Sequence, residues 1–134
     1  MRHALTLSTL VVSDYDEAID FFVGKLGFTL SQNIPAPQEN APDKRWVVVS
    51  PQGAEGPGLL LAQANGPEQT ATIGNQTGGR VSFFLQTDDC LRDFAAFSKA
   101  GVEFIEAEPR REPYGIVAVF RDISGNLWDL IEYA

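Results

Sequence analysis

One order of secondary-structure elements occurs twice in this chain of 134 residues, and it constrains the fold more than any other feature. Each half runs from a β-rich segment through an aspartate into a helix closed by glycine, and then into three more β-rich segments. The helix-starting residues Asp14 and Asp89 are separated by nearly the same interval as the helix-ending residues Gly27 and Gly101. Because each half alone would leave one sheet face uncovered, we expect two βαβββ modules that pack as a single α+β domain.

The boundaries of these elements follow from periodicity and from glycine and proline. Asp14, with Glu17 three positions later, has the pattern of a capping box, and apolar residues then repeat along one helical face. We predict strands at 5–12, 28–33, 45–50 and 59–62, a loop at 34–43, a second helix at about 91–100, strands at 81–86, 102–105, 114–120 and 127–132, and a charged loop at 106–113. Module 1 then covers about residues 1–64, a polar linker 65–79, and module 2 about 80–134.

Asp129 lies in the middle of the last predicted strand, between apolar neighbours on its own face. The polar turn before that strand contains Gly125 and Asn126, residue types that accept the positive φ of tight turns. A carboxylate in the middle of a strand needs a partner, a water-filled cleft or a proton, because burying it unpaired is costly. Asp129 is therefore the best candidate for a catalytic or ligand-contacting acid, and a structural carboxylate at a wet sheet face is the alternative.

Composition and charge exclude several function classes. The formal net charge of −8 disfavours nucleic acid as a partner, and it favours cationic or neutral ligands by long-range attraction or simply keeps the protein soluble. The single cysteine, Cys90, excludes an internal disulfide and a multi-cysteine zinc cluster. No apolar run reaches the ~18 residues of a membrane span. We expect a soluble, cytoplasmic protein that does not bind a membrane.

Five segments of the two predicted modules carry a family resemblance. They are Val-Ser-Asp (12–14), Ala-Ile-Asp-Phe-Phe (18–22), Lys-Leu-Gly-Phe (25–28), Lys-Ala-Gly-Val-Glu-Phe (99–104) and Phe-Arg-Asp-Ile-Ser-Gly-Asn-Leu-Trp-Asp-Leu (120–130). With these segments, paired βαβββ modules of this length resemble the vicinal oxygen chelate superfamily, which includes glyoxalase I, bleomycin-resistance proteins and extradiol dioxygenases. The resemblance covers nearly the whole chain, implies a cleft on the concave sheet of the two modules with the helices outside, and makes a homodimer the expected assembly.

Metal-dependent members of this family hold a divalent ion with side chains from the first and last strand of each module. The matching positions in this sequence are Leu7, Leu61, Ser82 and Asp129. Leucine cannot ligate a metal, serine is a weak neutral ligand, and a divalent site generally needs three or more suitable ligands. We therefore predict no metal and no other cofactor; a divalent metal is disfavoured.

The resemblance also suggests a largely apolar ligand cleft with a few polar points. Strand parity places Gln86 on the same face as Ser82 and Phe84. Trp46 and Tyr114 are candidate stacking groups at the rim, and core packing is the equal alternative for both. The predicted cleft residues are Leu7, Thr9, Trp46, Leu61, Ser82, Phe84, Gln86, Tyr114 and Asp129.

Neither His3 nor Cys90 supports a catalytic constellation. His3 is the only histidine, so no Ser-His-Asp or Cys-His arrangement can be assembled, and Cys90 follows two aspartates that disfavour a thiolate.

We hold three functions open. The first is a metal-free small-molecule-binding protein of the bleomycin-resistance type, whose ligand the acidic balance allows to be cationic. The second is a metal-dependent lyase, isomerase or dioxygenase, similar to glyoxalase I, that uses Asp129 with atypical ligands. The third is a non-catalytic interaction domain.

Overall fold

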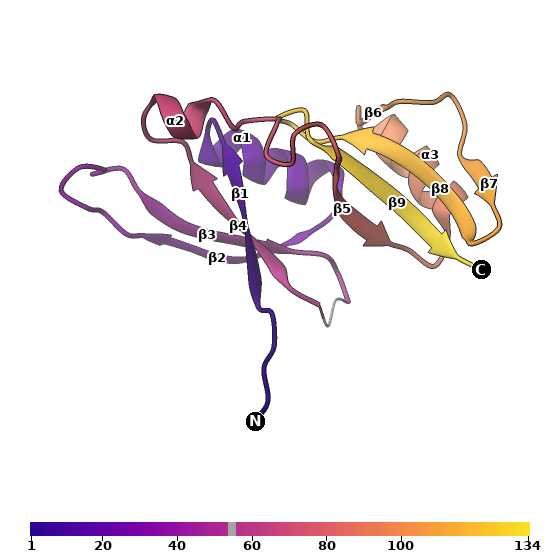
Figure 1. Ribbon diagram of the computed structural model, residues 1–134, viewed down its shortest axis with the longest axis horizontal. Coiled ribbons are helices and arrows are strands. Elements are labelled where there is room, and N and C mark those ends of the chain that lie inside the picture. The colour runs from indigo at the N-terminus through magenta and orange to yellow at the C-terminus, as the bar shows by residue number, and fades with distance from the viewer. Residues whose placement is uncertain (54–55) are drawn as a thin grey trace. The chain divides into compact units, whose positions relative to one another are not determined.

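The computed structural model describes residues 1–53 and 56–134, and the chain divides into two compact units, Met1–Ile73 and Gly74–Ala134. Each unit contains one sheet and a helix against it (Figure 1), which confirms the α+β class and its repeated plan. The elements of unit 1 are β1 (Leu7–Val12), α1 (Tyr15–Ile19), η1 (Asp20–Lys25), β2 (Thr29–Pro35), β3 (Arg45–Ser50), β4 (Gly58–Gln63) and α2 (Pro67–Thr70). The elements of unit 2 are β5 (Val81–Gln86), α3 (Cys90–Lys99), β6 (Glu103–Phe104), β7 (Arg110–Glu112), β8 (Gly115–Arg121) and β9 (Leu127–Tyr133).

The two sheets have the same topology. Unit 1 has the strand order β1-β4-β3-β2, and unit 2 has β5-β9-β8-β6, with β7 also paired to β8. In each sheet the first strand pairs in parallel with the last one, and the remaining pairs are antiparallel. A parallel pair requires a crossover connection, which the helix after the first strand begins in each unit.

The two main helices start and end in the same way. The Asp14 Oδ2 atom accepts a hydrogen bond from the Glu17 N–H at 2.9 Å, and Asp89 Oδ1 accepts one from Arg92 N–H at 3.0 Å. Both aspartates have extended backbone angles and satisfy a backbone donor that the first helical turn leaves unpaired. The closing glycines Gly27 and Gly101 have φ values of 74° and 97°, in the region that glycine adopts without a Cβ penalty.

The first helix differs from the continuous α-helix that the apolar periodicity predicts, because it widens into the π-helix η1 after Ile19. The Leu26 N–H donates to the Phe21 carbonyl at 3.2 Å, five residues back. A wider turn reduces the rotation between successive side chains, and both Phe21 and Phe22 are buried here although they are adjacent in sequence. Burial of this aromatic pair thus offsets the poorer helical geometry.

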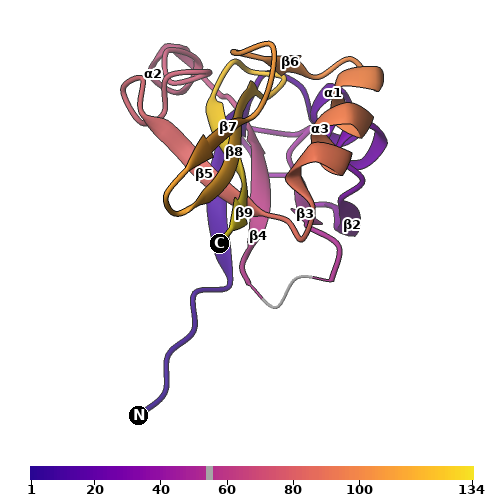
Figure 2. The same ribbon diagram turned by 90° about the vertical axis from the view of Figure 1, so that its right-hand side faces the viewer.

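Each unit buries one face of its sheet against its helix. In unit 1, Leu10, Val47 and Leu61 are cross-strand neighbours and are completely buried. In unit 2, α3 lies against β8 and β9 (Figure 2). The facing side chains there form an aromatic cluster in which Phe120 stacks on Trp128 at 5.6 Å between ring centroids.

The turn between β8 and β9 holds a buried carboxylate, that of Asp122. Asp122 is 5% exposed, and its carboxylate accepts hydrogen bonds from the backbone N–H groups of Ser124 and Asn126, from Asn126 Nδ2 and from Trp128 Nε1. These hydrogen bonds replace the hydration that the carboxylate loses on burial. Asp122 therefore fixes the hairpin that carries Asp129.

Two local predictions fail for identifiable reasons, and a third segment contains an element that the sequence did not predict. Pro35 belongs to β2 rather than to the loop, since it closes an edge strand, where a missing N–H costs no ladder hydrogen bond. The predicted charged loop 106–113 contains β7, whose residue Arg110 pairs with Val117 of β8. The polar segment 65–79 contains the single helical turn α2, with Pro67 in its first turn. In the part of the chain that the structure describes, no helix has the length and apolar character of a membrane span.

Candidate functional site

The open face of the unit 1 sheet, which is the face away from α1, carries Thr9 and Leu60. Thr9 pairs with Leu60 across the β1–β4 ladder, whereas the next residues along, Leu10 and Leu61, pair on the helix-facing side. Leu61, one of the predicted cleft residues, is fully buried, and it is also among the residues that line the unit 1 pocket described below. Leu60, on the open face, lines the same pocket.

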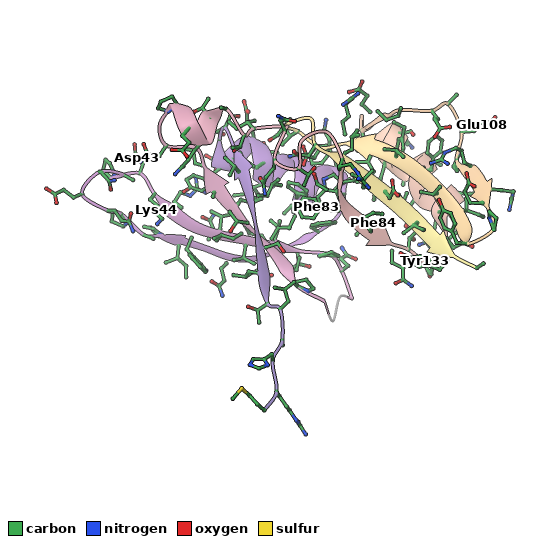
Figure 3. The ribbon with its side chains drawn as sticks, in the orientation of Figure 1. Asp43, Lys44, Phe83, Phe84, Glu108 and Tyr133 are labelled. Atoms are coloured by element: carbon green, nitrogen blue, oxygen red, sulfur yellow. The ribbon has the colours of Figure 1, made fainter. Side chains whose placement is uncertain are left out.

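The open face of the unit 2 sheet brings Phe84 beside Asp129. These two residues are register partners in the β5–β9 ladder, Asp129 pairs with Val119 on its other side, and Phe84 is 63% exposed (Figure 3). A register shift between Val81 and Phe83 interrupts the alternation that the sequence predicted for β5. Ser82 lies in this irregularity.

The other predicted polar cleft residues of unit 2 lie on β5 and just before β8. The Ser82 hydroxyl is 3.0 Å from the Thr77 hydroxyl of the preceding loop. Gln86 pairs with Ile131 and remains on the same face as Phe84. Tyr114, just before β8, is half exposed.

Burial raises the pKa of the Asp129 carboxyl, and the positive charge of Arg110 opposes that shift. Arg110 lies on β7 and is held by two carboxylates, with Arg110 Nε 2.6 Å from Glu106 Oε1 and Arg110 Nη1 2.7 Å from Glu112 Oε1. The charge of Arg110 is therefore balanced by Glu106 and Glu112, and Arg110 does not form an ion pair with Asp129. A carboxyl of raised pKa can accept or donate a proton, or receive a hydrogen bond from a ligand.

The residues at the family's metal positions do not fit a divalent ion. Leu7 and Leu61 offer no donor atom, and the Ser82 hydroxyl is turned to Thr77. Within residues 1–53 and 56–134, no group of three or more His, Cys, Asp or Glu side chains is close enough to hold a metal. Asp129 alone does not make a site for a cation that prefers six or more oxygen ligands or four mixed ones.

The two residues that sequence analysis set aside remain outside any reactive arrangement. His3 is exposed in the segment before β1. Cys90 is buried, and burial, followed by the charges of Glu132, Asp93 and Asp89, raises the pKa of its thiol to about 11. The Cys90 Sγ atom donates to the Leu130 carbonyl. A thiol of such pKa is almost entirely protonated at neutral pH, so it is a poor nucleophile.

A pocket of about 470 Å³ lies within unit 1, between the β2–β3 hairpin, the end of β4 and the α2 segment. Figure 3 shows Asp43 and Lys44 on the hairpin arm at this end of the unit. This volume is in the range of small-molecule sites. Its lining residues are Tyr15, Gln38, Asn40, Ala41, Pro42, Asp43, Lys44, Arg45, Trp46, Leu60, Leu61, Ala62, Gln63, Ala64, Asn65 and Gln69.

One wall of the pocket is braced by Tyr15 and Arg45. The Arg45 guanidinium lies 5.0 Å from the centroid of the Tyr15 ring and forms an ion pair with Asp16 at 3.1 Å. The Arg45 N–H also donates to the Tyr15 hydroxyl, and the guanidinium donates to Asn33 Oδ1. These contacts occupy the charge of Arg45, so it supports the wall and is not a free cation for a ligand.

The opposite side of the pocket is made by amide side chains that the sequence had placed at the edge of a linker. The Asn65 N–H donates to Gln69 Oε1 at 2.8 Å, and Asn65 Nδ2 donates to the Asn40 carbonyl at 3.4 Å. This last bond joins the α2 segment to the hairpin. Sequence analysis identified only Trp46 and Leu61 among the lining residues. The concentration of amides at 63, 65 and 69 was a signal, but nothing in the sequence places that segment against the hairpin.

Comparison with known proteins gives consistent relatives over the whole chain. A protein of Shewanella frigidimarina, described as uncharacterized, is 51% identical over 132 residues, which cover 98% of this chain and 95% of that protein. The crystal structure of UcmS2 has a TM-score of 0.82 at 28% identity and covers 98% of both chains. TnmS3, described as an antibiotic binding protein from Streptomyces sp. CB03234, has a TM-score of 0.75 at 30% identity, covering 100% of this chain and 98% of that one.

The family model of the Glyoxalase/Bleomycin resistance protein/Dioxygenase superfamily matches residues 2–130. With the repeated βαβββ plan and the relatives above, this match shows that the chain belongs to the glyoxalase/bleomycin resistance protein/dioxygenase superfamily.

Proposed function

We propose that this protein binds a small organic molecule without a metal ion and without transforming it. The observation that carries the proposal is the unit 1 pocket, whose lining combines aromatic, aliphatic and amide side chains. Such a lining matches the composition of ligand sites, in which a few polar groups orient a largely apolar ligand. The described pocket residues include no histidine or cysteine, so the pocket offers no nucleophile and base pair for acyl transfer.

The similarity to TnmS3 supports the same function, because that protein is described as antibiotic-binding. The donor set at the family's metal positions supports independence from metal, since two of the four side chains are leucine. An antibiotic-like molecule of natural-product size is therefore the ligand class to test first. The family resemblance supports a cytoplasmic protein that forms a homodimer. Sedimentation velocity of untagged protein would test the homodimer.

The test is a thermal-shift and calorimetric screen of untagged protein against natural-product antibiotics, each with and without EDTA. We expect at least one compound to bind saturably, with an affinity that EDTA leaves unchanged and with no product detectable by mass spectrometry. Loss of binding in EDTA would contradict metal independence. A broad screen without any saturable binder would contradict the proposal and favour the interaction domain.

A second function deserves a direct test because of Asp129. Its raised pKa on an open sheet face is the property of a general acid or base. If this carboxyl served a glyoxalase-like lyase or a dioxygenase, turnover of a hemithioacetal or a catechol would require a divalent ion and would be lost in Asp129→Asn. We expect no turnover of either substrate with Ni²⁺, Zn²⁺, Mn²⁺ or Fe²⁺ present.

A further inference from the structure

The amide groups of Gln63 and Gln69 give the pocket a definite hydrogen-bonding character. The Tyr15 backbone N–H lies 3.3 Å from Gln63 Oε1, and the Asn65 backbone N–H lies 2.8 Å from Gln69 Oε1. A backbone N–H can only donate, so in both residues the atom that faces it must be the amide oxygen. This fixes the orientation of both side chains without ambiguity between oxygen and nitrogen.

Because the oxygen of each side-chain amide accepts from the backbone, the NH₂ group of each glutamine is left to donate elsewhere. Among the described residues, neither Gln63 Nε2 nor Gln69 Nε2 donates to a protein atom. Both residues line the pocket. The pocket lining therefore includes two amide NH₂ groups that have no protein acceptor among the described residues, and such donors are complementary to acceptor oxygens such as carbonyls on a ligand.

The formal charges around the pocket select against an ion. Asp43 and Lys44 are adjacent residues of opposite charge on the hairpin, and Arg45 is committed to Asp16 and Asn33. The lining thus presents balanced charge. An anion would in addition be repelled by the protein's net charge of −8, and a cation finds only Asp43, whose neighbour Lys44 opposes it.

The pocket lining also contains an aromatic ring and small aliphatic side chains. Trp46 lines the pocket and remains 38% exposed although it lies within β3. Leu60 and Ala62 alternate along β4 on the same face and also line the pocket. An indole beside small aliphatic groups favours a planar ring, which can stack at little entropic cost.

We propose that the unit 1 pocket takes a neutral, planar aromatic molecule with carbonyl oxygens, its ring against Trp46 and its oxygens on the amide groups of Gln63 and Gln69. The inference rests on the proposed small-molecule function, and it adds the place and the chemistry of the ligand. It departs from the cationic ligand that the overall charge allowed, because a local balance of charge outweighs a distant net charge at contact distance.

The test uses Nile red, a neutral planar dye with a ring carbonyl, on the full chain. We expect saturable binding with one site per chain and with quenching of Trp46. The protein has two tryptophans, so Trp128→Phe leaves Trp46 as the reporter and Trp46→Phe leaves the buried Trp128. Quenching should occur in Trp128→Phe and be absent in Trp46→Phe. The cationic planar dye proflavine should bind at least tenfold more weakly.

The decisive variant is Gln63→Glu, which keeps an oxygen for the Tyr15 N–H and replaces the free NH₂ by a charged acceptor. We expect Nile red to bind at least tenfold more weakly to Gln63→Glu than to the wild type, and we expect a loss of the same size in Gln69→Glu. Gln52→Glu, in the turn after β3 and outside the pocket, adds the same charge and should leave the affinity unchanged. Circular dichroism of each variant shows whether the fold is retained.

The outcomes separate this inference from the proposed function. Unchanged Nile red binding in Gln63→Glu and Gln69→Glu, with loss in Phe84→Ala or Asp129→Asn, would overturn the unit 1 site and leave a binding function on unit 2. Tighter binding of proflavine than of Nile red would overturn the neutral ligand class. Absence of saturable Nile red binding would overturn the inference, whereas only failure of the antibiotic screen contradicts the function.

Discussion

Unit 1 and unit 2 are built on one plan but place their polar side chains differently. In unit 2, the polar residues Asp122 and Asn126 are buried and join the β8–β9 turn to Trp128. In unit 1, the amides of Gln63 and Gln69 line a pocket and are only partly or little buried. Buried polar groups stabilise a fold when fully paired, and groups with unpaired donors at a pocket are available to a ligand.

The comparison teaches which features the fold itself requires. The helix caps Asp14 and Asp89 and the glycines Gly27 and Gly101 occur in both units, because each satisfies a backbone requirement of the same βαβββ path. Within residues 1–53 and 56–134, the long β2–β3 hairpin is found in unit 1 and the Asp122 network in unit 2. These two features are therefore the ones to compare when a role is sought for each unit.

The largest expected effect comes from removing the buried carboxylate of unit 2. Asp122→Ala removes the carboxylate that accepts from Trp128 Nε1–H and from the Asn126 amide, so we expect a loss of about 3 kcal/mol of stability. Urea unfolding followed by Trp128 emission in a Trp46→Phe background measures it. Asp122→Asn, which retains one acceptor, should lose less. A loss below about 1 kcal/mol would show that the Asp122 hydrogen bonds contribute little to the stability of unit 2 and would contradict the contrast with unit 1.

The helix-ending glycines should respond alike. Gly27→Ala and Gly101→Ala both force a Cβ into the left-handed region, and we expect each to cost about 1–2 kcal/mol. A hypothetical Cβ at Gly27 has only Gln52 Nε2 within 4 Å, at 3.8 Å, so the cost there is conformational and not a clash. Thermal unfolding by circular dichroism compares the pair. A difference above about 1 kcal/mol would break the equivalence of the two modules.

The helix-starting aspartates provide a second matched pair with a smaller effect. Asp14→Ala and Asp89→Ala each remove one side-chain acceptor for a backbone N–H, and we expect each to lose about 1 kcal/mol. Asp14→Ser and Asp89→Ser should recover most of it, since serine is also a good N-cap. Denaturant midpoints of the four variants test this, and a failure of rescue would point to a role other than capping.

The smallest effect concerns pH and the open face of unit 2. Burial raises the folded pKa of Asp129 above its ordinary 3.8, so its contribution to stability is fully present below that value and is lost as pH rises through the folded pKa. Asp129→Asn should therefore gain stability relative to wild type as pH rises from about 3 to 7. Urea unfolding at several pH values measures the difference.

Asp88 gives the opposite sign and serves as the control for that experiment. The hydrogen bond and charge of Arg92 lower its pKa, so its contribution is present above its ordinary pKa and is lost as pH falls. Asp88→Asn should therefore be less stable than the wild type at neutral pH, and this difference in stability should disappear as the pH falls. Parallel pH trends in the two variants would contradict the assigned environment of Asp129.

Sequence reasoning reached the architecture because its signals are local. Strand periodicity, the capping pattern after Asp14 and the glycines Gly27 and Gly101 each act within a few residues, and β3 and β5 have the predicted bounds. Face assignments were less secure. The irregularity at Ser82 altered the alternation predicted for β5, since one residue of register inverts a strand's faces.

The sequence by itself determined the repeated α+β plan, the superfamily and the mismatch between Leu7 or Leu61 and a metal ion, because these depend on residue type and local spacing. Only the tertiary structure decided that Gln63 and Gln69 line one pocket with Trp46, and that Asp122 is buried beneath a four-donor shell. These arrangements join segments that are distant in the chain or depend on how a turn packs. Their physical cause is the packing of strands and loops around each core, which no local pattern encodes.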